Sequence, residues 1–191
     1  MTSPADPPSP PPKLNFNGIF LVGFMGAGKT SVGLALARSL GWRFVDLDER
    51  IVLRAGRSIA EIFEQEGESG FRQMEHLELQ RLCGEFQSQD TVASLGGGAW
   101  TQPANVALLK GSSLPVFFLD APVEELWRRC RPQHGVRPLL RNEKEFRALY
   151  AARRPVYLDG TLRVETHARS VEEVAQHITL LLGLAGNLPT T

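Results

Sequence analysis

The sequence predicts an α/β fold in which a parallel β-sheet is covered by helices on both faces. Short apolar runs, typical of strands, alternate along the chain with longer segments of helical periodicity. The runs are apolar throughout, as expected for strands that are buried on both faces of a sheet. The chain has 191 residues, of which 42% are hydrophobic, and this is enough for one domain with its own core.

Five strands and seven helices are expected. The strands cover residues 18–23, 43–46, 91–95, 114–119 and 161–165. The helices cover residues 28–40, 58–66, 70–84, 103–110, 122–131, 143–157 and 171–183. Ser58 with Glu61 and Ser170 with Glu173 match the S-x-x-E capping box, which satisfies the backbone amides at a helix start. Gly41 is placed to end the first helix in the left-handed conformation. Ligands of such sheets bind at the carboxyl ends of the strands, so the loops that follow the strands are the candidate sites.

The composition indicates a single domain over residues 15–184 with a tail at each end. The first twelve residues hold six prolines, and we expect residues 1–14 to be disordered and residues 185–191 to be frayed. The start lacks the basic and apolar regions of a secretory signal, and no apolar stretch is long enough to cross a bilayer of roughly 30 Å. We therefore expect a cytoplasmic protein that does not bind membranes, and we expect it to be a monomer.

Charge and cysteine content exclude several classes of protein. The 21 basic and 21 acidic residues give a formal net charge of zero, which argues against general affinity for nucleic acid. Cys83 and Cys130 have no metal-ligand spacing. Two reduced thiols are expected, with a structural disulfide as the alternative.

The stretch GFMGAGKT, residues 23–30, matches the phosphate-binding pattern G-x-x-x-x-G-K-[ST]. It follows a predicted strand and opens a predicted helix, whose N-terminal amides favour an anion. Lys29 is placed to reach the β- and γ-phosphates, and the Thr30 hydroxyl is placed to ligate Mg²⁺. The alternative is a glycine-rich turn with a chance lysine. The context favours phosphate binding.

Asp46 and Asp48 follow the second predicted strand, in the stretch FVDLDERI. Asp48 could do no more than cap a short helix. Near a phosphate and metal site, however, two carboxylates suit two tasks. One would hold waters of the metal, and the other would accept a hydrogen bond from a substrate hydroxyl and help to remove its proton.

Two further stretches contain residues suited to a small acidic substrate. In SGFRQME, Arg72 and Glu75 are one helical turn apart and can form an ion pair. In SLGGGAW, Gly96, Gly97 and Gly98 follow the third predicted strand. Three successive glycines are either a loose turn or a place where a ligand lies against bare backbone.

Residues 128–154 carry eight arginines and one lysine against two glutamates, a local charge of 9 − 2 = +7. The stretch RPQHGVRPLLRNE within them is rich in proline and glycine, which indicates a mobile basic lid that closes over phosphates and excludes water. Arg137, before Pro138, is the candidate contact to the transferring group. A nucleic-acid patch is the alternative, but few aromatic residues are interleaved with the arginines.

The P-loop, DLD, GFRQME, LGGGA, VRPLL and RRPVY occur in an order and spacing that resemble the shikimate kinase family. The resemblance covers about residues 16–183. It implies a three-layer P-loop kinase of the nucleoside-monophosphate-kinase type, with a five-stranded parallel sheet. It also implies a mobile lid at about 131–142 and a substrate-binding region at about 47–75. The implied activity is transfer of the γ-phosphoryl group of ATP to the 3-hydroxyl of shikimate, on the route to chorismate and the aromatic amino acids.

The resemblance also implies roles for individual residues. Asp48, Lys29 and Arg137 would be catalytic, with Asp48 as the base or near it. Thr30 would bind Mg²⁺ directly, and Asp46 would bind it through water. ATP contacts are implied for Gly26, Ala27, Gly28, Lys29, Thr30, Ser31, Arg129, Arg137 and Arg169. The adenine region is the weakest part of the match, and this affects Arg129 and Arg169.

On the substrate side, the resemblance implies that Arg72 and Arg153 clamp the carboxylate of shikimate. Glu75 would position Arg72, and Gly97 would offer its amide. Arg154 adjoins Arg153 and could take its role, although the register of RRPVY favours Arg153. The implied substrate contacts are Asp48, Arg72, Glu75, Gly96, Gly97, Gly98 and Arg153.

Three other functions are considered as alternatives. One is a kinase of the same build that acts on gluconate or a nucleoside monophosphate. The second is a nucleotide-dependent switch, but the chain lacks the N-K-x-D sequence of a guanine site. The third is a binding module without activity, and the intact Lys29, Asp48 and Arg137 argue against it.

Overall fold

A computed structural model describes residues 16–130 and 142–185 of the chain. The expected tail at 1–14, the end of the chain from residue 186 and all of the expected lid except Asn142 lie outside the described residues.

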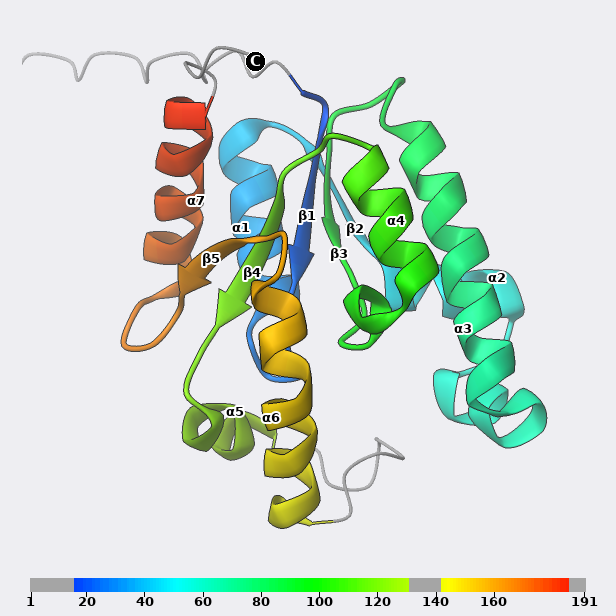
Figure 1. Ribbon diagram of the computed structural model, residues 1–191. Coiled ribbons are helices and arrows are strands. Elements are labelled where there is room, and N and C mark those ends of the chain that lie inside the picture. Colours follow the sequence, from blue (N-terminus) through cyan, green and yellow to red (C-terminus); the bar gives the residue numbers. More distant parts are fainter. Residues whose placement is uncertain (1–15, 131–141, 186–191) are drawn as a thin grey trace, which may run out of the picture.

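Five strands and seven α-helices make up the described chain, and the five strands are those that the sequence predicts (Figure 1). The strands are β1 (Gly18–Val22), β2 (Arg43–Asp46), β3 (Thr91–Ser94), β4 (Val116–Asp120) and β5 (Leu162–Glu165). The helices are α1 (Lys29–Leu40), α2 (Leu47–Ala55), α3 (Ile59–Glu85), α4 (Pro103–Gly111), α5 (Val123–Cys130), α6 (Glu143–Leu158) and α7 (Val171–Ala185), with a 3₁₀ helix η1 (Ala99–Thr101).

The strands form one sheet in the order β2-β3-β1-β4-β5, and every neighbouring pair is parallel. The register places Gly18 beside Thr91 of β3 and Phe20 beside Val116 of β4. Because all strands run the same way, the loops after β1, β2 and β3 leave the sheet at the same edge. The predicted α/β fold with a five-stranded parallel sheet is confirmed.

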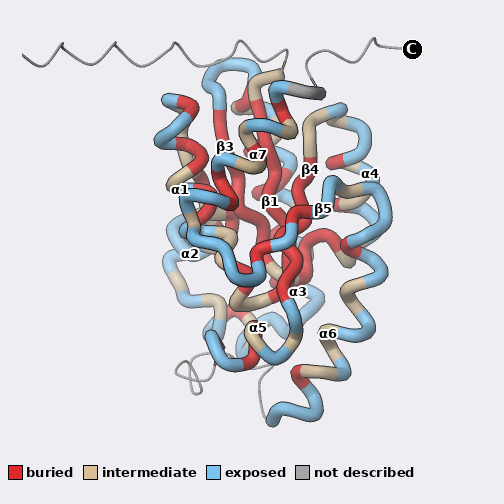
Figure 2. The backbone as a smooth tube through the Cα atoms, turned by 90° about the vertical axis from the view of Figure 1, so that its left-hand side faces the viewer, coloured by how far each residue is buried: buried red, intermediate tan, exposed pale blue. Residues whose placement is uncertain are grey.

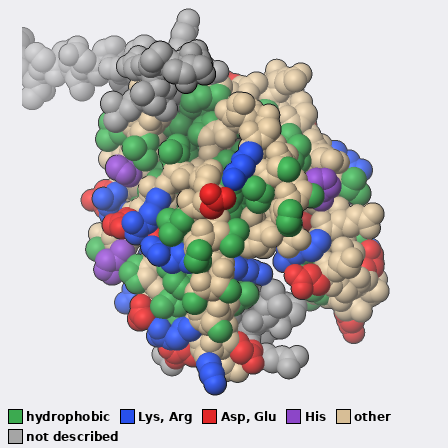
Figure 3. All heavy atoms as spheres, viewed as in Figure 1, with side chains coloured by type: hydrophobic (Ala, Val, Ile, Leu, Met, Phe, Trp, Pro, Cys, Tyr) green, Lys and Arg blue, Asp and Glu red, His purple; other side chains and the backbone are tan. Residues whose placement is uncertain are grey.

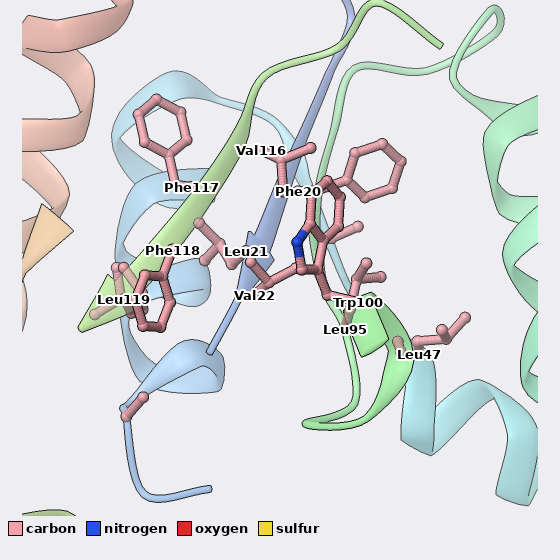
Figure 4. Packing of buried hydrophobic residues seen from close by; sticks show 14 of the residues in the cluster. Phe20, Leu21, Val22, Leu47, Leu95, Trp100, Val116, Phe117, Phe118 and Leu119 are labelled. Atoms are coloured by element: carbon pink, nitrogen blue, oxygen red, sulfur yellow. The ribbon is translucent and has the colours of Figure 1, made fainter. Parts of the chain in front are cut away.

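Helices cover both faces of the sheet. Buried residues follow the strands through the middle of the molecule, with α1 on one side and α4 and α6 on the other (Figure 2). All five residues of β1 are buried, because both faces are covered. Phe20 and Val22 lie on the same side of β1 as Trp100, and Leu21 lies on the opposite side, as the alternation of a strand requires (Figure 4).

The expected capping is confirmed at three helix ends. Ser58 and Glu61 exchange hydrogen bonds in a capping box at the start of α3. Ser170 and Glu173 do the same at the start of α7. Gly41 ends α1 with a φ of 70°, in the left-handed region.

Two parts of the helical prediction differ from the structure. Helix α2 was not expected, and its N-cap is Asp46 rather than Asp48: the Asp46 carboxylate accepts from the Asp48 amide at 3.0 Å. The helices expected at 58–66 and 70–84 form one element, α3, with a break at Gly67, where φ is 68° and ψ is −175°. A glycine tolerates this backbone conformation, so the chain keeps its helical course on both sides of the break.

Part of the positive charge in the described residues of segment 128–154 is paired with carboxylates. Arg147 contacts Glu124 and Glu143, and Arg154 contacts Asp120. Basic and acidic side chains lie side by side on the face drawn in Figure 3. Such a mixed surface does not favour a nucleic-acid patch.

The two cysteines are thiols and not a disulfide, as expected, and burial raises the pKa of Cys83 to about 11. Within residues 16–130 and 142–185, no helix is both long enough and apolar enough to span a bilayer.

Candidate active site

The phosphate loop, residues 23–30, joins β1 to α1. Gly26 and Gly28 have φ values of 80° and 89°, which side chains with a Cβ rarely adopt. Gly28 is the N-cap of α1 and provides no side-chain cap, so the first amides of the helix point into the loop. The Lys29 ammonium donates to the carbonyls of Gly23 at 3.0 Å and Phe24 at 3.3 Å. Amides, helix N-terminus and ammonium together form a site that suits a chain of phosphates.

Thr30 and Asp46 form the donor set that suits Mg²⁺ beside this loop. The Thr30 hydroxyl donates to Oδ2 of Asp46 at 3.0 Å, so a hydroxyl from the first turn of α1 meets a carboxylate at the end of β2. Mg²⁺ prefers oxygen ligands and is commonly held by one or two protein groups together with phosphates and water. No cluster of three or more histidine, cysteine or acidic side chains among the described residues offers another metal site. The predicted pair therefore fits the ion.

Glu75 is a buried acidic residue of the candidate site. Its side chain is fully buried, and Oε2 accepts from the Arg72 guanidinium at 2.9 Å, while Oε1 has no hydrogen-bond partner among the described residues. Burial raises the pKa of Glu75 to about 7, although Arg72 opposes the change; the nearby Asp48 adds to it. Burial alone would lower the pKa of Arg72, but Glu75 and Glu68 hold it above its usual value.

The glycine loop, residues 96–98, packs so closely on these groups that two of its residues, Gly96 and Gly98, have no room for a side chain. A Cβ on Gly96 would lie 2.6 Å from Oδ1 of Asp48 and 3.0 Å from Oε1 of Glu75. A Cβ on Gly98 would lie 2.4 Å from Nη2 of Arg72. Close contact therefore requires glycine at residues 96 and 98, and the segment is not a loose turn.

The glycine loop also touches the phosphate loop. A Cβ placed on Gly97 would be 3.7 Å from the Gly23 carbonyl oxygen and 3.8 Å from the Met25 nitrogen. The carboxylates, Arg72 and the phosphate loop thus converge on one short stretch of backbone. This is the contact expected if two ligands meet between the loops.

Arg153 and Arg154 have different surroundings. Arg153 Nη1 donates to the Gly97 carbonyl at 3.2 Å. Arg154 turns away and binds the buried carboxylate of Asp120, with Nη2 to Oδ2 at 2.6 Å, and Arg163 binds the same carboxylate at 2.8 Å. Only Arg153 of the two contacts the glycine loop, as the register predicts.

The residues expected near the adenine are less well assembled. Arg129 donates to the carbonyl of Gly26 at 3.2 Å and pairs with Glu125, so it does reach the phosphate loop. Arg169 lies in the turn before α7 and borders a surface hollow of about 300 Å³ with residues of that helix, none of them from the phosphate loop. Arg137 lies outside the described residues, and its role stays a prediction.

A surface hollow of about 700 Å³ is not the site. It lies beside the edge strand β2, and of the predicted site residues it includes only Asp46. Its walls hold an ion cluster in which Glu78 and Glu85 of α3 bind Arg50 of α2. This cluster ties α2 to α3, and the site is identified by the convergence of groups and not by volume.

Two residues of the site were missed by the sequence analysis. Tyr157 donates its hydroxyl to the Gly97 carbonyl, and Asp120 holds Arg154. The RRPVY stretch contained Tyr157, but only its arginines were interpreted. Asp120 ends a strand, as Asp46 does, and that position was the one available signal.

Comparison with known proteins identifies the family. A family model described as shikimate kinase matches residues 25–182.

The chain belongs to the shikimate kinase family.

A shikimate kinase of Persephonella marina is 38% identical over 84% of this chain and 95% of its own length. A solved shikimate kinase from Acinetobacter baumannii in complex with shikimate has a TM-score of 0.82, with 38% identity over 92% of this chain and 97% of that one. A gluconokinase from Sinorhizobium meliloti, at 19% identity and a TM-score of 0.56, shares the fold alone.

As a shikimate kinase, the enzyme transfers a phosphoryl group from ATP to shikimate, with Mg²⁺ as the metal partner of the nucleotide. The reaction belongs to the biosynthesis of chorismate and the aromatic amino acids. The predicted family, fold and activity are confirmed.

Replacing Glu75 with glutamine should remove a pH-dependent loss of stability. The pKa of Glu75 is raised from 4.5 to about 7, so its contribution to stability is complete below about pH 4.5 and is lost as the pH rises through about 7. The free energy of unfolding of the wild-type enzyme should therefore fall, relative to Glu75→Gln, by up to about 3 kcal/mol between pH 4.5 and pH 8. Urea unfolding across this range measures the difference. Parallel pH profiles of the two proteins would contradict the raised pKa.

Proposed function

We propose that the glycine loop separates two binding sites and that each predicted residue except Arg137 serves one of them. The supporting observation is that Gly97 adjoins both Gly23 of the phosphate loop and Arg153. The triphosphate of ATP lies along the phosphate loop, and shikimate lies on the other side, against Asp48, Arg72 and Arg153.

The nucleotide side consists of Lys29, the amides of residues 26–31, Thr30 and Asp46. Lys29 exchanges its bonds to the loop carbonyls for bonds to the β- and γ-phosphates. Thr30 and Asp46 hold Mg²⁺, Asp46 through water; the bound ion neutralises charge on the phosphate oxygens. Arg129 adds a cation beside the loop. Arg137 spans the γ-phosphate and shikimate, and Arg169 contacts the nucleotide base.

Asp48 receives the 3-hydroxyl of shikimate. It lies in the first turn of α2, directly after the end of β2, and its Oδ1 lies against Gly96. A carboxylate accepts hydrogen bonds and does not donate them when ionised, so it orients a hydroxyl with the oxygen lone pair exposed for attack. Asp48 then accepts the proton as the new phosphate ester forms.

Arg72 and Arg153 bind the carboxylate of shikimate from two sides. Guanidinium groups suit this anion because their planar fork can donate to both oxygens. Glu75 and Glu68 hold Arg72 against the glycine loop, and the Arg153 side chain is partly buried over Gly97. Gluconate and nucleoside monophosphates differ from shikimate in size and in the position of their charge. A coupled ADP-release assay with shikimate, gluconate and AMP side by side therefore tests the specificity. We further expect a monomer that works in the cytoplasm.

Replacing Asp48 with asparagine should lower turnover by on the order of 10²-fold or more, because the hydroxyl loses its proton acceptor. The affinity for ATP should stay close to that of the wild type, because Asp48 serves the other ligand. Steady-state kinetics together with an ATP titration measure both quantities. A variant with near-normal turnover would remove Asp48 from the reaction.

Arg153→Ala should weaken the binding of shikimate, whereas Arg154→Ala should lower the stability of the fold. Without Arg153, the KM for shikimate should rise about 10- to 100-fold with little change in the KM for ATP, since a hydrogen bond to a charged group is lost. Without Arg154, the buried Asp120 loses a partner, so the free energy of unfolding should fall by about 1–3 kcal/mol while the KM for shikimate changes little. The reverse pattern would mean that Arg154 holds the substrate.

A further inference from the structure

The Gly97 carbonyl accepts hydrogen bonds from two side chains of α6. One donor is the Tyr157 hydroxyl, and the other is Nη1 of Arg153 at 3.2 Å. Tyr157 is fully buried, and its ring stacks on Phe118 of β4 with the centroids 5.0 Å apart and an interplanar angle of 22°. The hydroxyl therefore meets the glycine loop from a fixed position in the core.

A reciprocal bond joins the same two segments. The indole nitrogen of Trp100, two residues after the glycine loop, donates to the carbonyl of Val156 at 3.0 Å. Val156 lies in the last turn of α6, where helix carbonyls lack partners within the helix. The glycine loop and the end of α6 are thus joined by bonds in both directions.

Because each peptide unit is planar, a bond that holds its carbonyl also fixes the direction of its N–H. In a trans peptide the N–H points opposite to the preceding C=O, and the described chain has no cis peptide. The Gly96 carbonyl is held by the Ala99 amide at 3.0 Å, which fixes the N–H of Gly97. The Gly97 carbonyl is held by Tyr157 and Arg153, which fixes the N–H of Gly98. Among the backbone carbonyls of the described residues, none outside the regular elements accepts from either of these two N–H groups.

We propose that Tyr157 is a positioning residue for the phosphorylation of shikimate. Its hydroxyl keeps the Gly97 carbonyl satisfied when Arg153 leaves that oxygen to bind the substrate carboxylate. The proposal rests on the role given above to Arg153 and the glycine loop.

The Gly97 carbonyl and the substrate carboxylate compete for Arg153. Without the Tyr157 hydroxyl, Arg153 would be the one side chain that holds the Gly97 carbonyl, and its move to shikimate would leave a buried acceptor without a donor. Part of the binding free energy would then be lost. Burial raises the pKa of Tyr157 to about 12, so the hydroxyl keeps its proton and remains a donor at any pH at which the enzyme works.

The chain provides a matched control, because its only two tyrosines both lie on α6. The Tyr150 hydroxyl donates to the Ala121 carbonyl at 3.0 Å and lies 3.3 Å from Oδ1 of Asp120, away from the glycine loop. Tyr157→Phe and Tyr150→Phe each remove one such hydroxyl and keep the ring.

Calorimetric titration with shikimate, together with steady-state kinetics, tests the proposal. Tyr157→Phe should raise the Kd and KM for shikimate about tenfold, the size of one lost hydrogen bond, and leave the KM for ATP within about twofold. Tyr150→Phe should leave both shikimate constants within about twofold even if it unfolds at lower urea concentration. Unchanged shikimate binding in Tyr157→Phe, or equal effects in the two variants, would overturn the proposal. If Arg153→Ala weakens shikimate binding and Tyr157→Phe does not, only the positioning role fails; if neither variant weakens it, the proposed substrate site fails as well.

A spectroscopic test covers the case in which Tyr157→Phe does not fold. In Tyr150→Phe the one remaining tyrosine is Tyr157, so an enzyme labelled with ¹³Cζ-tyrosine gives a single NMR signal from the carbon that bears the hydroxyl. Saturation with shikimate should shift this signal, because the hydroxyl takes over the Gly97 carbonyl. A signal that does not move would overturn the proposal.

Discussion

Glu75 is buried where α3 meets the end of β2 and the glycine loop, and a carboxylate in that place constrains the groups around it. Burying a charge without a partner is costly, so Arg72 must lie against it, at 2.9 Å. Together with Asp48, whose Oδ1 is nearer, this carboxylate leaves no space for a side chain at Gly96. Arg72, in turn, leaves none at Gly98. Glu75 thus accounts for the position of the arginine proposed to bind the substrate, and together with Asp48 and Arg72 it accounts for two of the three glycines.

The parallel sheet brings this constellation to the nucleotide. The order β2-β3-β1 places three segments side by side at the carboxyl edge of the sheet. They are the junction of β2 and α2 with Asp46 and Asp48, the glycine loop after β3 and the phosphate loop after β1. Helix α6 adds Arg153 from the other side of the glycine loop, and it is anchored through Arg154 to Asp120 at the end of β4. Phosphoryl transfer needs little chemistry from the protein beyond such positioning and charge stabilisation. The rigidity of these anchors is therefore part of the catalytic apparatus.

Local patterns in the sequence predicted the elements that depend on local interactions. The phosphate loop, the box of Ser58 and Glu61 and the end of α1 at Gly41 each follow from a few adjacent residues. Helix α2 was missed because its capping carboxylate, Asp46, had been interpreted only as a metal group, whereas the structure gives it contacts to both Thr30 and the helix amide. Tyr157 was missed because its partner is a backbone carbonyl 60 residues away, and no pattern in the sequence indicates which carbonyl will lack a donor.

The central claim is that Arg72 binds the carboxylate of shikimate, and a comparison of shikimate with its primary amide tests it directly. Dissociation constants for the two compounds, measured by calorimetry on the wild type and on Arg72→Ala, form a double-mutant cycle. The wild type should bind the amide about 10- to 100-fold more weakly than shikimate, and the variant should discriminate far less between them. If both proteins lose affinity for the amide by the same factor, the carboxylate does not lie on Arg72, and the account of the site is wrong.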